Sequence, residues 1–127
     1  MNKASIRIWG REFTLDLYYE GSRKAEPSRN QQKAFSAFLS ATMEIEKSCQ
    51  DVKEYVLHDS PQQFEEKTIE NIFRYVMPAY IYIPRSCDDE HKNVIIMCDY
   101  KFDPEHGLAV VFENGKLIRV CPQDDVL

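Results

Sequence analysis

The sequence predicts one α+β domain over residues 1–127, in which an antiparallel sheet packs on a long helix and a second, antiparallel helix. Residues near both ends of the chain alternate between apolar and polar side chains, which is typical of strands with one buried face. The central residues repeat apolar side chains every three or four positions, which is typical of helices. With 43% hydrophobic residues, the chain can fill one core, so we expect a single domain.

The first predicted element is a hairpin over residues 4–19. Gly10 and Arg11 form its turn in this prediction, because glycine suits the first position of a type II′ turn. Pairing across that turn sets Ile8 opposite Phe13. One face of the hairpin is then apolar, and it consists of Ile6, Ile8, Phe13, Leu15 and Leu17.

Two helices are expected next. The first spans about residues 30–58 on an apolar stripe that includes Phe35, Phe38, Ile45, Cys49, Val52 and Val56. A helix this long is unusual in a small domain, so we expect a bend or break near residues 47–51. Ser60 and Pro61 are typical of a helix start, which predicts a second helix over residues 61–76 that is ended by Pro78.

The remainder of the chain is predicted to be strand, at residues 79–84, 93–102, 107–113 and 116–121. Asn114-Gly115 is typical of a type I′ hairpin turn, since both residues accept a positive φ. If residues 103–107 form a five-residue loop, Tyr100 faces Val110 and Val110 faces Arg119. One face of this meander is then apolar, with Arg119 as its only charge.

The opposite face of the meander has an apolar centre that includes Met97, Val111, Ile118 and Val120. A solvated antiparallel face would be more polar than this. We therefore expect either that the N-terminal hairpin covers this face or that the face binds a partner or a second copy of the chain.

The segment "DPEHG" at residues 103–107 raises the question of a metal or acid–base site. Asp103 can hydrogen-bond the backbone ahead of it, Pro104 presets φ, and Gly107 accepts a left-handed conformation, so a turn explains these residues. Glu105 and His106 have no such role. The sequence favours a turn, and no catalytic residue or cofactor is assigned.

A metal site remains the alternative interpretation of this segment. Candidate ligands are Cys87, His91, Asp103, Glu105 and His106. The similar segment "CDDEH" at residues 87–91 lies at the other end of a strand roughly 30 Å long, so the two segments should not share a site. Nucleophilic chemistry could use a cysteine–histidine pair, either Cys87 with His91 or Cys121 with His106. A chain with four cysteines and three histidines contains many such pairs by chance, so these carry little weight.

Composition limits the partners and the compartment. The net charge is -5, and residues 44–70 carry most of the acidic excess, which argues against nucleic acid and suits a basic protein partner or plain solubility. No apolar run approaches the roughly 20 residues of a membrane span, and no signal peptide is recognisable, so we expect a cytoplasmic protein with reduced cysteines.

The C-terminal third resembles an uncharacterised family of small bacterial cytoplasmic domains that end in a D-x-E-H-G hairpin. The residues that carry this resemblance are Phe102, Asp103, Glu105, His106, Gly107, Val110, Phe112, Gln123 and Asp124. The resemblance implies an α+β domain of unknown biochemical role and, by analogy with some such domains, a toxin-binding immunity function.

Three functional hypotheses follow. The first is a non-enzymatic protein-binding or regulatory module that contacts a protein partner or forms a homodimer through the acidic helices or the apolar sheet face. The second is a metal-binding protein or metal-dependent hydrolase that uses Asp103, Glu105 and His106. The third is a small-ligand pocket between helices and sheet, lined by Tyr80, Tyr82 and Tyr100.

Overall fold

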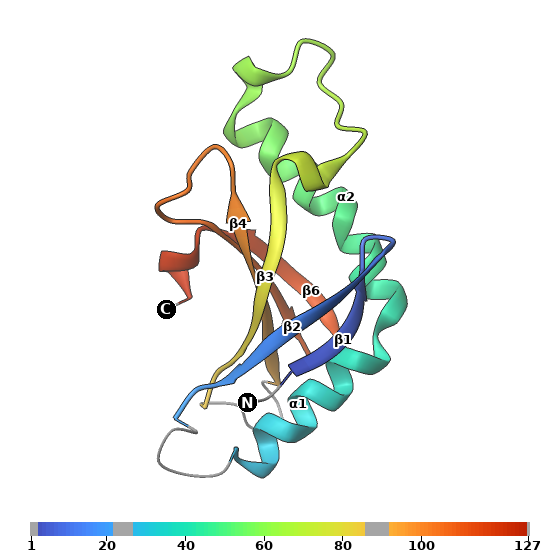
Figure 1. Ribbon diagram of the computed structural model, residues 1–127, viewed down its shortest axis with the longest axis vertical. Helices are drawn as coiled ribbons and strands as arrows, with labels where there is room; N and C mark the ends of the chain where they lie inside the picture. The colour runs from blue at the N-terminus through green and yellow to red at the C-terminus, as the bar shows by residue number, and fades with distance from the viewer. Residues whose placement is uncertain (1–2, 22–26, 86–91, 127) are drawn as a thin grey trace.

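A computed structural model describes residues 3–21, 27–85 and 92–126 of the chain (Figure 1). Its elements, in chain order, are β1 (Lys3–Ile8), β2 (Arg11–Tyr19), α1 (Arg29–Ser40), α2 (Thr42–Asp59), η1 (Pro61–Gln63), η2 (Ile72–Arg74), β3 (Val76–Ile83), β4 (Asn93–Tyr100), β5 (Leu108–Glu113), β6 (Lys116–Cys121) and η3 (Gln123–Asp125). The predicted α+β class is confirmed.

One six-stranded sheet organises the fold, with the strands side by side in chain order. Neighbouring strands are antiparallel except β2 and β3, which are parallel because α1 and α2 connect them. Both helices lie on one side of the sheet (Figure 1). Helix α2 packs against β1 and also against β6, the two edge strands, so the sheet must curve around this helix.

The N-terminal hairpin turns one residue earlier than predicted. Trp9 and Gly10 form the turn with φ values of 51° and 83°, which fits a type I′ rather than a type II′ turn. Ile6 therefore pairs with Phe13, a shift of two residues that leaves every side chain on its predicted face. Tertiary contacts stabilise this conformation, because the buried Trp9 indole donates a 2.9 Å hydrogen bond to Ser48 Oγ.

The long predicted helix breaks at Ala41 and not near residues 47–51. Ser40 Oγ donates to the Ser36 carbonyl, a side-chain bond that competes with the helical backbone bond and often bends helices. The turn at Gly115 lies against the same point, where a Cβ on Gly115 would stand 3.2 Å from Ala41 Cβ. The break thus lets α1 and α2 follow the curved sheet.

The predicted helix over residues 61–76 is wrong. Only the short turns η1 and η2 form there, and β3 begins at Val76. Lys67 has a φ of 55°, which no α-helix accommodates, and Phe64 instead reaches an aromatic cluster with Tyr75 and Phe102 at ring-centroid distances of 5.1 and 5.9 Å. Pro78 lies inside β3 next to a break in register with β4, where its missing N–H is tolerated.

The C-terminal meander forms as predicted, but with a longer loop. Asn114 and Gly115 have φ values of 53° and 80°, which confirms the type I′ turn. The last β4–β5 pair is Cys98 with Leu108, and residues 101–107 connect the two strands, so the predicted five-residue loop is wrong. Tyr100 does not pair with Val110, because Val110 pairs with Ile96. Tyr100 pairs only on the other side of β4, with Val76 of β3.

Arg119 does not lie on the helix-facing side of the sheet, contrary to the prediction. A β-bulge shifts the β5–β6 register after the pair Phe112–Leu117, so that Arg119 pairs with Val111 and Val120 pairs with Val110. The helix-facing side is therefore free of the predicted charge. Its centre is closed by Phe38 of α1, whose ring lies 5.2 Å from that of Phe112.

Candidate functional site

The side of the sheet away from the helices, which we call the second face, carries two rows of side chains that run across the strands. Strand pairing defines both rows. The first row is Tyr18, Tyr82, Ile95, Val111 and Arg119, and the second is Asp16, Tyr80, Met97, Ala109 and Cys121. Five strands thus contribute to one mainly apolar surface with an aromatic end.

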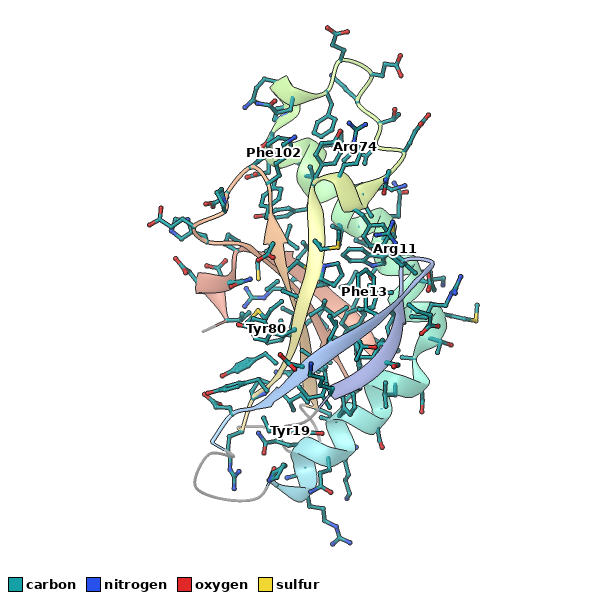
Figure 2. All side chains as sticks on the ribbon, in the orientation of Figure 1. Arg11, Phe13, Tyr19, Arg74, Tyr80 and Phe102 are labelled. Atoms are coloured by element: carbon teal, nitrogen blue, oxygen red, sulfur yellow. The ribbon has the colours of Figure 1, made fainter. Side chains whose placement is uncertain are left out.

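The N-terminal hairpin does not cover this face, which corrects one of the two predicted arrangements. The hairpin continues the sheet sideways, since β1 and β2 are its first two strands. Met97 is nevertheless 0% exposed, because large neighbours such as Tyr80 and Tyr82 close over it. Figure 2 shows Tyr80 on the side of β3 away from Phe13. Of the three contact residues predicted on this face, Met97 and Val111 are buried and Ile118 is exposed.

Tyr18 and Ile118 are the most exposed large apolar side chains of the second face, and they lie near opposite ends of its first row. Tyr18 is 56% exposed and packs on Tyr82 with ring centroids 5.5 Å apart, while Ile118, beside the bulge in β6, is 50% exposed. A shallow hollow of about 360 Å³ lies between these ends, and it is lined by Glu20, Tyr82, Pro84, Asn93, Ile95, Val111, Ile118, Arg119 and Val126. Apolar floor and polar rim are the usual anatomy of a protein contact surface.

Residues 122–126, which we call the strap, follow β6 and lie against this surface. Val126 packs on the apolar cluster of the second face and lines the hollow. Arg119 donates to the Asp125 carbonyl at 3.2 Å, and Gln123 Nε2 donates to the Cys98 carbonyl at 3.0 Å. In Figure 1 the C-terminal turn η3 lies on the side of the sheet away from the helices.

Gly107 lets the loop between β4 and β5 meet the strap. Its φ of 63° is left-handed, as the sequence predicts, and a Cβ at this position would stand 2.5 Å from Gln123 Nε2 and 2.9 Å from the Cys98 carbonyl oxygen. The backbone N–H of Gln123 also donates a hydrogen bond to the His106 carbonyl, at 3.3 Å. Glycine is therefore required by both the backbone and the contact.

His106 lies between two carboxylates, one from its own loop and one from the strap. Its Nδ1 is 3.0 and 3.1 Å from the two carboxylate oxygens of Asp103, and its Nε2 is 3.5 Å from Asp124 Oδ2. The hydrogen bond and charge of Asp103, followed by the charge of Asp124, raise the pKa of His106. Asp103 also accepts a bond from the His106 amide, which confirms its predicted turn role.

This geometry suits an imidazolium better than a metal ligand, since a carboxylate already faces each ring nitrogen. Glu105 is exposed at the loop tip. Cys87 and His91 lie outside the described residues. Within residues 3–21, 27–85 and 92–126, no group of three or more His, Cys, Asp or Glu side chains is placed to hold a metal ion.

The other predicted sites are not assembled. Tyr80 and Tyr82 belong to the second face, whereas Tyr100 lies on the helix side and donates a 2.7 Å hydrogen bond to Asp59, so the three do not line one pocket. Burial raises the pKa of the Cys98 and Cys121 thiols, which disfavours the thiolate that a nucleophile needs.

The acidic helix surface forms a separate groove. Between α2 and β6 lies a hollow of about 500 Å³, lined by Asp51, Glu54, Tyr55, His58, Leu117, Ile118, Arg119 and Val120. It meets the second face at Ile118 and Arg119. The two surfaces considered from sequence are therefore neighbours around β6.

Sequence reasoning missed Tyr18 and Arg119 as members of the second face. The alternation in "DLYY" and "YIYI" is a signal that could have placed the tyrosines together once β2 was paired with β3. The position of Arg119 could not be predicted in this way, because the alternation of side chains in β6 does not reveal the bulge that changes its face.

The fold places the chain among the small α+β domains in which helices cover one side of a mostly antiparallel sheet. The family described as "Domain of unknown function (DUF6985)" matches residues 1–127, and the chain belongs to this family. The match spans the whole chain and not only the C-terminal third. No match was found among curated proteins or among solved structures. None of the helices in the described residues has the length and apolar character needed to cross a membrane.

Proposed function

We propose that this domain is a non-enzymatic protein-binding module whose contact surface is the open part of the second face. The observation that carries the proposal is the exposure of Tyr18 and Ile118 on either side of a hollow with an apolar floor. Tyrosine is enriched at protein interfaces because its ring buries a large apolar area while its hydroxyl keeps a hydrogen-bond partner. Glu20 and Arg119 supply charges of opposite sign at the rim.

The partner in this proposal is another protein or a second copy of the chain, in a bacterial cytoplasm. Neutralisation of a toxin, as in immunity proteins, is the form of binding that the family resemblance favours. A regulatory contact with a cellular protein would use the same surface. Either role requires the side chains at both ends of the hollow.

The test compares two double variants that remove equal numbers of exposed apolar side chains. Tyr18→Ser/Ile118→Ser alters the second face, whereas Leu39→Ser/Met43→Ser alters exposed residues of α1 and α2. Affinity capture with quantitative mass spectrometry should show a protein that the wild type and the helix variant retain and the second-face variant loses. Sedimentation velocity would show the same pattern for self-association.

A partner or dimer that survives Tyr18→Ser/Ile118→Ser would contradict the proposal. The alternative, a metal-binding protein or metal-dependent hydrolase using Asp103, Glu105 and His106, makes a different prediction. Elemental analysis of purified protein would then find near-stoichiometric metal, and His106→Ala would lose it.

A further inference from the structure

The strap is attached to the rest of the domain by a small number of contacts, which include the backbone bond from Gln123 to the His106 carbonyl. Gln123 and Arg119 supply hydrogen bonds, Val126 supplies one apolar contact, and Asp124 supplies the ion pair with His106. Segments held by a few partly exposed bonds open at a much lower free energy than a core does. We therefore expect the strap to open at a lower free energy than the sheet.

What lies beside the strap is the second of the two rows on the second face. Tyr80, Met97, Ala109 and Cys121 belong to this row, and the last three are buried although α1 and α2 lie on the other side of the sheet. Val126 packs on the cluster that contains them. Departure of the strap would extend the open surface from the hollow toward Cys121.

We propose that the strap is a latch over the contact surface, and that His106 holds it closed by placing a positive charge between Asp103 and Asp124. This inference rests on the proposed function, because it describes how access to the same surface is regulated. In the closed state the surface offers Tyr18 and Ile118, and in the open state it also offers the row that ends at Cys121.

The charges around His106 set the direction of the switch. Asp103 and Glu105 face it from its own loop and Asp124 faces it from the strap, and all three are acidic. As the pH rises through the folded-state pKa of His106, the ring loses its charge and the attraction to Asp124 disappears. The latch is thus closed at mildly acidic pH and loosens as the pH rises.

Alkylation of Cys121 by a maleimide reports latch opening in the isolated protein. Mass spectrometry locates the modified cysteine. Its protection is the alkylation rate of the urea-unfolded chain divided by the rate of the folded protein at the same pH. Wild-type protection should fall as the pH is raised from 6 to 9. His106→Gln should be about fivefold less protected at pH 6, the factor expected from surface ion pairs, and should show a flat pH profile.

Two further variants and one internal control sharpen this test. Asp124→Asn removes the strap carboxylate but leaves the Asp103–His106 pair, and it should lose protection like His106→Gln. Glu105→Gln, which removes an exposed charge from the same loop, should stay within about twofold of the wild type. Cys98, fully buried on the helix side, should stay unreactive throughout and so exclude global unfolding.

Equal protection of Cys121 in the wild type, His106→Gln and Asp124→Asn would overturn the latch. So would a wild-type profile that does not change with pH. The assay contains no partner, so its failure leaves the contact surface to be judged by the Tyr18 and Ile118 variants, and failure of those variants leaves the latch result intact.

Discussion

Ile96 and Met97 are neighbours in β4, and both are 0% exposed, yet they lie on opposite faces of the sheet and are buried by different means. Ile96 belongs to the large cluster beneath α1 and α2, whereas Met97 belongs to a small cluster closed by tyrosines and the strap. Complete burial therefore does not reveal how firmly a residue is enclosed. On one face the cover is a packed helical layer, and on the other it consists of side chains and the short strap.

The largest expected effect comes from the helix-covered face. Phe112→Ala removes a fully buried ring that packs edge-on against Phe38, and the helical layer above it can collapse only partly. We expect a loss of about 3–5 kcal/mol in the free energy of unfolding. Urea denaturation followed by circular dichroism measures this loss, and a loss below that of Met97→Ala would contradict the comparison.

A smaller effect is expected for Met97→Ala on the second face. The cover there consists of flexible side chains that can settle into the space, so the loss should be about 2 kcal/mol, at the low end for buried methionine. The same denaturation experiment checks this value. Ile96→Ala is the matched control in the neighbouring position, and it should cost more than Met97→Ala.

Gly107→Ala tests the contact between loop and strap. The left-handed backbone should cost about 1–2 kcal/mol, and the new Cβ must also displace Gln123. Gly10→Ala is the matched control, because Gly10 also has a positive φ but a Cβ there would meet nothing within 4 Å. Equal losses of thermal stability in the two variants would show that the strap contact contributes nothing.

The pH dependence of stability should differ between the wild type and His106→Gln. Because the acidic neighbours raise the folded-state pKa of His106, its stabilising contribution is complete below the unfolded pKa of about 6.5 and is lost as the pH rises through the folded value. Urea titrations from pH 5.5 to 9 should give a wild-type advantage that shrinks with rising pH. An advantage that grows with pH would contradict the assignment of Asp103 and Asp124 as partners.

The smallest effect is expected for Tyr18→Ser. This side chain is more than half exposed, so the free energy of unfolding should change by about 0.5 kcal/mol or less. Thermal unfolding monitored by circular dichroism checks this. A much larger loss would mean that Tyr18 mainly covers Tyr82 and is not free to contact a partner.

Local sequence signals predicted those parts of the fold that depend on side-chain periodicity. The alternation of β4 and β5 assigned their faces correctly even though the loop between them was too short in the prediction, because an even shift in register preserves the faces. Asn114-Gly115 was readable because its turn depends on the conformational freedom of those two residues.

Long-range contacts determined the parts that could not be predicted. Trp9 occupies a left-handed position because its indole reaches Ser48 on α2, and no local pattern shows such a contact. The segment after Ser60 has a helix-like start, but Phe64 is partly buried by Tyr75 and Ile72 is buried by separate tertiary contacts. At the candidate site, the sequence predicted Asp103 and Gly107 correctly as turn residues. It did not predict the ion pair of Asp124 with His106, because that contact depends on where the strap lies.

Helix α2 packs against both edge strands, and this has a consequence for solubility. An uncovered sheet edge offers unpaired N–H and C=O groups on which another chain can add a strand, the first step of ordered aggregation. Because the sheet curves around α2, one helix packs on both edge strands, and the bulge in β6 makes that edge a poorer template for an added strand. Detachment of α2 would therefore remove a packing partner from both edge strands at once, so we expect it to loosen the two edges of the sheet together.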